Sequence, residues 1–424
     1  MGPPALERPP FLMEDMKAGI ALRRIPYPYR AMLAICSDLD GTPDRHVYRK
    51  IVQFLNTTEE TAMGPGVGLE TGNSIYFDMP GGFAYWTTDD AGRAMIRALI
   101  RSGHIDCLHS FGDLAVTRRQ AARTIEELIR HDCRLQIWIN HDVAPTNFGD
   151  DMAGHGDEPG HPAYHADLTT AYGIRYVWQG RVTSIIGQEV PARLSGLWTY
   201  RHPIRSARTV SKEAAKQLLA RRGHPHYVIY AGNRVFRTAV LRDGTGVYEF
   251  LRANPYWGGV SSGDTGRDIG AILTSRMLSR LVRRGGVCLL YTHLGKCFGP
   301  DRPFGPEAAA GFRRLADEHR SGRILVTTSL RCLRYVTVKR QISWTVGKDA
   351  AGIIIQIHTN QSDPRLNRLS PSDTDGLTFY VPSNRPVRIE VDGVPARATR
   401  ANPPDETGRP SVMLEWPKLP AAPI

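Results

Sequence analysis

Short apolar runs alternate with amphipathic stretches along the chain from about residue 30 to residue 330. The apolar runs have the length of buried strands, and the stretches between them carry apolar residues at helical spacing. The predicted strands are residues 31–38, 74–79, 105–110, 135–140, 174–179, 226–231 and 286–293, with 324–329 as a candidate eighth strand. The predicted helices are residues 89–103, 117–132, 211–223, 268–286 and 307–322.

This alternation is typical of the α/β class, in which helices connect parallel strands. Seven or eight such strands most simply close into a (β/α) barrel, so we predict a seven-stranded barrel over residues 31–335, preceded by an N-terminal extension at residues 1–30. An open doubly wound sheet is the alternative. No glycine-rich phosphate loop follows the first strand, so the pattern does not support nucleotide binding.

The pattern changes near residue 336, where helical spacing stops. Short apolar runs then alternate with Pro, Gly, Asn and Asp, as in "ISWTVG", "GIIIQIHT", "GLTFYVP", "PVRIEVDG" and "SVMLEW". Runs of this kind are typical of short strands joined by tight turns. We therefore predict a small all-β sandwich domain over residues 336–424 that braces the barrel.

Composition narrows the class of protein. The chain has 424 residues, 41% of them hydrophobic and 23% charged, and no apolar run approaches the ~18 residues of a membrane span. The net charge of +12 is scattered and accompanies no nucleic-acid-binding motif, which favours a solvated basic surface over a nucleic-acid partner, with an anionic glycan as the weaker alternative. Six cysteines without a CxxC pair predict buried free thiols, and the absence of a leader pattern in residues 1–15 predicts a cytoplasmic location. The oligomeric state is left open.

Polar residues gather where the predicted strands end. Asp38 and Asp40 close the first strand, and alternation along a strand makes them project the same way. Two neighbouring carboxylates are costly to bury unless they share a cation or a proton. His109 and His293 close two other strands, and the carboxyl ends of barrel strands converge on one pocket.

Three of these strand ends resemble motifs of the polysaccharide deacetylase (NodB-homology) superfamily. "SDLDGT" is similar to the Asp-Asp-Gly motif of the family with one residue inserted, "GHIDCLHSFGD" to its histidine motif up to the final position, and "CLLYTHLG" to the strand that ends in its catalytic histidine. The resemblance covers roughly residues 30–300. It implies a NodB-like barrel and a metal-dependent hydrolase that removes an N- or O-acyl group from a carbohydrate.

The resemblance also implies roles for individual residues. Asp40 and His109 would bind the metal, Asp38 would be the general base and His293 the acid that protonates the leaving group. Asp113 stands where the family has its second metal histidine. A ligand set of two carboxylates and one imidazole suits a divalent ion, Zn²⁺ first, with Mn²⁺, Fe²⁺ or Co²⁺ as alternatives. Asp113 is equally consistent with a cap for a helix that begins near residue 116.

Further candidates flank the same pocket. Three polar residues, 140–142, end the fourth predicted strand. The histidine at position 165 lies four residues after His161, a spacing found in metal sites. The two aromatic residues after "ANP" could stack on a sugar ring. His141 and His165 are the alternatives to Asp113 as the last metal ligand. These candidates for substrate binding are Asn140, His141, Asp142, His165, Tyr256 and Trp257.

Two rival functions use the same residues. A metal-independent glycoside hydrolase would draw a carboxylate pair from Asp38, Asp40, Asp113 and Asp142. A non-catalytic glycan-binding or assembly protein would keep the pocket without a working metal site.

Overall fold

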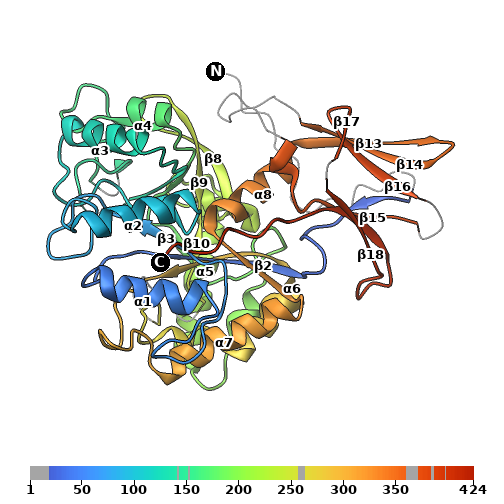
Figure 1. The fold of residues 1–424 in the computed structure, drawn as a ribbon, viewed down its shortest axis with the longest axis horizontal. Helices are drawn as coiled ribbons and strands as arrows, with labels where there is room; N and C mark the ends of the chain where they lie inside the picture. Colours follow the sequence, from blue (N-terminus) through green and yellow to red (C-terminus); the bar gives the residue numbers. More distant parts are fainter. Residues whose placement is uncertain are drawn as a thin grey trace.

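The computed structural model describes residues 19–140, 143–150, 153–255, 263–359, 371–382, 386–396 and 398–424. Its main feature is a mixed α/β unit with a curled sheet of 11 strands, joined to two smaller sheets (Figure 1). Among the described helices, none combines the length and apolar character that a bilayer crossing requires.

The central strand of the large sheet is β2 (Ala31–Ser37), whose seven residues are all buried. Both faces of β2 are covered, as in α/β sheets with helices outside and a packed interior. One set of its side chains joins the interior core shared with Tyr176 and Trp178: Met32, Ala34 and Cys36. The alternate set joins the core under helices α6 (Ser275–Arg284) and α7 (Pro306–Arg320): Ala31, Leu33 and Ile35.

The strands of the large sheet follow one another in a curved row. Their order is β7 (Val182–Thr183), β10 (Arg252–Ala253), β11 (Gly286–Thr292), β2, β3 (Gly72–Ile75), β4 (Ile105–Leu108), β5 (Ile137–Ile139), β6 (Tyr176–Trp178), β9 (Gly246–Phe250) and β8 (Phe236–Val240), and β12 (Ile324–Thr327) also pairs with β2. Every pairing is parallel except that of β8 with β9. The α/β prediction is confirmed, but the sheet is a curled half-barrel that ends at β7 and β8, rather than a closed barrel of seven strands.

Eight α-helices accompany the large sheet in the described part of the chain. They are α1 (Arg45–Asn56), α2 (Asp90–Arg101), α3 (Arg118–Arg130), α4 (Ala166–Tyr172), α5 (Pro203–Arg221), α6 (Ser275–Arg284), α7 (Pro306–Arg320) and α8 (Ser329–Gln341). Side chains of Asp44 and Asp89 accept hydrogen bonds from the first backbone amides of α1 and α2, which begins each helix at its cap.

The strand predicted at residues 226–231 is wrong. These residues form most of a 3₁₀ segment, η3 (Val228–Asn233), packed on α5, where the Gln217 side chain donates to the Tyr230 carbonyl. The next strands are the hairpin β8 and β9 instead. A short apolar run does not distinguish a strand from a buried turn of helix, because both bury the same side chains.

The two smaller sheets have four strands each and pack together as a sandwich. One contains β13 (Ile342–Asp349), β14 (Gly352–Thr359), β16 (Val387–Val391) and β17 (Val394–Pro395), and the other β1 (Ala21–Leu22), β15 (Thr378–Tyr380), β19 (Ser411–Leu414) and β18 (Thr399–Asn402). The rings of Trp344 and Phe379 meet edge to face at 5.3 Å and join the two sheets.

Both ends of the described chain cross between these units. Strand β1, from the range predicted as an extension, pairs with β15 in the sandwich. The last residues return to the large sheet, where the Leu419 amide donates to Glu70 and Ala422 enters the core beside α2 (Figure 1). The sandwich is thus tied to the α/β unit at both ends of the described chain.

Candidate functional site

Asp38 follows β2 and lies buried at the centre of the candidate site, with 1% of its surface exposed. The guanidinium of Arg252 binds both carboxylate oxygens, at 2.6 and 3.0 Å, and the Ser74 hydroxyl donates to Oδ1 at 2.9 Å. Burial opposes ionisation of Asp38. The positive charge of Arg252 and the contact with His109 outweigh burial and hold the pKa of Asp38 well below its usual value. Asp38 is therefore a carboxylate at neutral pH.

Arg252 lies on β10 and is itself 1% exposed. Its guanidinium packs over the ring of Trp178, 4.4 Å from the ring centre, and that of Tyr291, 5.5 Å away. Sequence reasoning missed this residue. The available signal was the arginine within the largely apolar run "VYEFLRA". An arginine buried in a strand needs a carboxylate partner, so its presence there indicates one.

Three side chains converge as metal ligands would. Asp38, Asp40 and His109 each offer one ligand atom, and these atoms lie within 4.8 Å of one another. His109 Nε2 is 3.4 Å from Asp38 Oδ2, and its ring lies against that of Tyr76, with centroids 4.2 Å apart. Asp40 Oδ1 is buried and accepts no hydrogen bond in the described part of the chain. An orphan carboxylate oxygen beside an imidazole is a position that a divalent cation fits.

His293, at the end of β11, closes the other side of the site. Its Nδ1 lies 2.5 Å from Oδ2 of Asp264, its Nε2 lies 3.5 Å from Asp40 Oδ1, and its backbone amide donates to the Asp264 carbonyl. The carboxylate of Asp264 favours a proton on Nδ1 and directs Nε2 toward Asp40. Sequence reasoning missed Asp264 too, because "SGDTG" reads as an ordinary turn.

The other carboxylate oxygen of Asp40, Oδ2, contacts a lysine. Lys296 Nζ lies 2.6 Å from Asp40 Oδ2, and this lysine is nearly half exposed. Burial opposes ionisation of Asp40, but the positive groups around it, His293 first, lower its pKa below the usual value. Asp40 thus carries a negative charge, which a metal-binding role requires.

The polar atoms of two predicted residues are engaged by other partners. Both ring nitrogens of His165 are engaged, with Thr169 Oγ1 at 2.7 Å and the Thr146 carbonyl at 2.8 Å, and burial lowers its pKa to about 4. His165 is a neutral core histidine and does not complete a metal shell. The Asn140 amide bridges Trp138 Nε1 and the backbone of Phe148, so it holds a loop.

Asp113 does not join the group of ligand atoms among the described residues. Asp113 is not the cap of α3 (Arg118–Arg130) either, because the N-cap is Thr117, whose amide and hydroxyl donate to the Gln120 side chain. Asp113 remains near the site, since its charge adds to the burial that raises the pKa of Tyr76. The other candidates lie outside the described residues: His141, Asp142, Tyr256 and Trp257.

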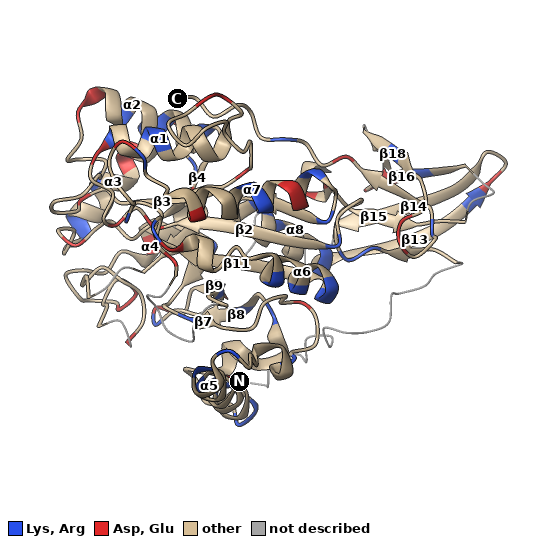
Figure 2. Cartoon of the chain, turned by 90° about the horizontal axis from the view of Figure 1, so that it is seen from below, with Lys and Arg blue, Asp and Glu red and all other residues tan. Residues whose placement is uncertain are grey.

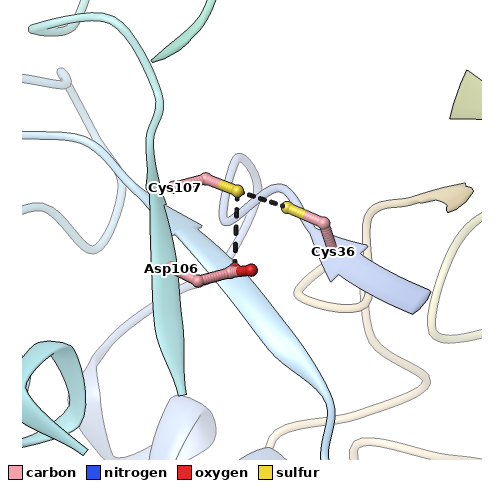
Figure 3. A group of neighbouring side chains, drawn as sticks. All are labelled: Cys36, Asp106 and Cys107. Atoms are coloured by element: carbon pink, nitrogen blue, oxygen red, sulfur yellow. Dashed lines mark hydrogen bonds between the residues drawn. The ribbon is translucent and has the colours of Figure 1, made fainter. Parts of the chain in front are cut away.

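A second group of potential metal ligands, Cys36, Asp106 and Cys107, lies on strands β2 and β4 (Figure 3). Cys36 on β2 and Cys107 on β4 have their sulfur atoms 3.3 Å apart, and the Cys107 thiol donates to Asp106 Oδ1. Arg252 Nη2 lies 3.4 Å from Cys36 Sγ, so a positive charge already occupies one side of this group. A cation would be repelled there, and burial raises the pKa of Cys107 well above its usual value.

Comparison of the chain with protein-family models, with curated proteins and with solved structures gives no match.

Proposed function

We propose that this protein is a metal-dependent hydrolase of the NodB type that removes an N- or O-acyl group from a carbohydrate. The observation that carries the proposal is the pair of acid–base groups on the two sides of one ligand cluster. Asp38 is held by Arg252 and His293 by Asp264, and Asp40 lies between them with an orphan oxygen. Acyl transfer to water requires a base, an acid and a positive charge near the carbonyl.

Asp40 and His109 would hold the metal, with Asp38 beside them. A bound divalent ion lowers the pKa of a water molecule and polarises an acyl carbonyl. Asp38, kept ionised by Arg252, accepts the proton of the attacking water. His293 keeps one proton on Nδ1 toward Asp264, so a proton on Nε2 is the one delivered to the leaving amine or alcohol.

The glycoside hydrolase alternative is less well supported. A glycosidase needs one carboxylic acid with a raised pKa beside one carboxylate. The pKa values of Asp38 and Asp40 are both lowered by neighbouring positive groups. Neither residue therefore suits the role of general acid.

Elemental analysis and an acyl-release assay test the proposal together. We expect about one divalent ion per chain and acetate release from acetylated oligosaccharides that chelator abolishes. His109→Ala should lose both metal and activity, whereas Asp38→Asn should keep the metal and lose activity by ~10²–10⁴-fold. The control is His131→Ala, which removes a half-exposed histidine at the end of α3. Equal metal content in wild type and His109→Ala would contradict the ligand assignment.

A further inference from the structure

A cavity of about 190 Å³ lies between the 3₁₀ segment η2 (Leu194–Leu197), the first turns of α5 and one face of α6. Among the described residues that line it, none is acidic and none belongs to the site formed by Asp38, Asp40, His109 and His293. The volume far exceeds the ~10–15 Å³ that one water molecule needs. A ligand of several atoms therefore fits.

Three arginines of α6 lie along this face, spaced by four residues: Arg276, Arg280 and Arg284. Each donates to a backbone carbonyl of the segment at residues 191–199. Arg284 Nη2 lies 2.7 Å from the Pro191 carbonyl, Arg280 binds the Gly196 carbonyl, and Arg276 Nη2 lies 3.1 Å from the Trp198 carbonyl. The carbonyls orient the guanidinium groups, but they do not neutralise them.

The charges of these arginines are not balanced by a carboxylate among the described residues, and some of their N–H donors have no acceptor there. Within the described ranges, no carboxylate forms an ion pair with Arg276, Arg280 or Arg284, and Nε of both Arg280 and Arg284 is buried without an acceptor. Burial and the neighbouring arginines lower the pKa of Arg280 to about 10. An anion in the cavity would supply the missing negative charge to Arg276 and Arg280, which line it, and guanidinium groups suit the paired oxygens of phosphate.

The surroundings are also basic. Residues 191–224 contain eight Lys or Arg and one acid, Glu213, which is buried and already paired with Lys216 at 2.8 Å. Figure 2 shows Lys and Arg on the surfaces of α5 and α6. Like charges in one region raise the local concentration of anions and speed their binding.

The rest of the lining mixes polar side chains, mostly Thr and Ser, with apolar and aromatic ones. Leu197, Ile272 and Met277 line the cavity, and Trp198 is 38% exposed beside it. Tyr200, with 91% of its surface exposed, packs edge to face on Trp198 at 6.4 Å. An exposed aromatic pair next to a cationic pocket provides a surface on which a flat or ring-shaped group can stack.

We propose that this cavity binds a small ligand with a phosphate group, whose oxygens accept from Arg276 and Arg280 and whose attached ring packs on Trp198. A phosphate is favoured over a carboxylate because it brings three acceptor oxygens and a charge near −2 to a cluster of cations. The site is separate from the proposed hydrolase site, and its test needs no catalytic activity.

The experiment is calorimetric titration of the full chain with glucose 1-phosphate and with inorganic pyrophosphate, with glucose as the neutral probe. We expect saturable binding of one glucose 1-phosphate per chain and none of glucose. Arg276→Gln and Arg280→Gln should weaken binding at least about tenfold. Arg276 is exposed, so Arg276→Gln tests the site even where Arg280→Gln perturbs folding.

The matched control is Arg283→Gln, which removes the same charge from the same helix outside the cavity lining. Its affinity for glucose 1-phosphate should stay within about twofold of wild type. Equal weakening by Arg283→Gln and Arg276→Gln would show a diffuse basic surface and overturn the proposal. Absence of saturable binding by both phosphate probes, or binding only to vesicles of phosphatidylglycerol, would also overturn it.

Discussion

Arg252 and Asp38 are 214 residues apart in the chain and meet as a fully buried, bidentate ion pair at the mouth of the curled sheet. The pair explains how a carboxylate stays ionised where burial would protonate it. It also ties β10 to the end of β2, so that the geometry of the candidate base depends on an element distant in sequence.

Breaking this ion pair should destabilise the fold. Arg252→Met leaves Asp38 buried without its arginine partner, so we expect the free energy of unfolding to fall by about 3–5 kcal/mol in denaturant titrations near neutral pH. The double variant Asp38→Leu/Arg252→Met should recover part of this loss, because no charge then remains buried. An unchanged free energy of unfolding in Arg252→Met would contradict the assigned pairing.

The same pair makes stability depend on acid. The pKa of Asp38 is lowered in the folded state, so its stabilising contribution is present above the unfolded pKa of about 3.9 and is lost as the pH falls through the lower folded value. Acid titration of unfolding should show this loss in wild type. Asp38→Asn should lack that component.

Asp264 acts on the proposed reaction through His293. Asp264→Asn removes the carboxylate that favours a proton on Nδ1, so we expect acyl release to fall by about 10–100-fold with metal content unchanged. The loss should appear in kcat rather than in KM, because Asp264 acts through His293 and is not proposed to contact the substrate. The control is Asp268→Asn, an exposed aspartate four residues further along that bonds to Thr265. An unchanged kcat in Asp264→Asn would contradict this positioning role.

Asp106 gives a second pH dependence, of opposite sign to that of Asp38. Burial raises its pKa to about 6, so the folded state binds the proton more tightly than the unfolded chain. Its contribution is present below the unfolded pKa of about 3.9 and is lost as the pH rises to about 6, by up to about 3 kcal/mol. Unfolding measured at steps between pH 4 and pH 7 should show this downward component as the difference between wild type and Asp106→Asn.

Wild type must be compared with Asp106→Asn, because His165 changes its protonation in the same pH interval. Its lowered pKa, about 4, makes stability rise with pH between that value and about 6.5. The two slopes oppose each other in wild type. A pH-independent difference between wild type and Asp106→Asn would contradict the raised pKa of Asp106.

Gly72 allows Asp106 to fit beside β3. A Cβ atom at Gly72 would lie 2.5 Å from Asp106 Oδ1, so Gly72→Ala should destabilise the protein by about 1–3 kcal/mol. Gly82→Ala is the matched control, because its Cβ would meet only Met79 Cγ at an ordinary 3.5 Å. Thermal unfolding of the two variants measures the difference, and equal midpoints would contradict the packing argument.

The sequence by itself determined the class of fold and four residues of the candidate site. Alternating strands and helices follow from local periodicity, and Asp38, Asp40, His109 and His293 stand at strand ends that the apolar runs mark directly. The hairpin β8 and β9 and the open ends of the sheet were not predictable in this way. Strand number and closure depend on which edges pair, and pairing leaves little trace in short apolar runs.

Only the tertiary structure decided which polar residues act together. Arg252 and Asp264 come from segments with no motif, yet each lies within hydrogen-bonding distance of a residue chosen from sequence. His165 has metal-like spacing, but it packs among Phe111, Trp138 and Phe148 with both nitrogens bonded. Two charged side chains form an ion pair only when they are close in space. For residues distant in sequence, that distance depends on how the strands pair.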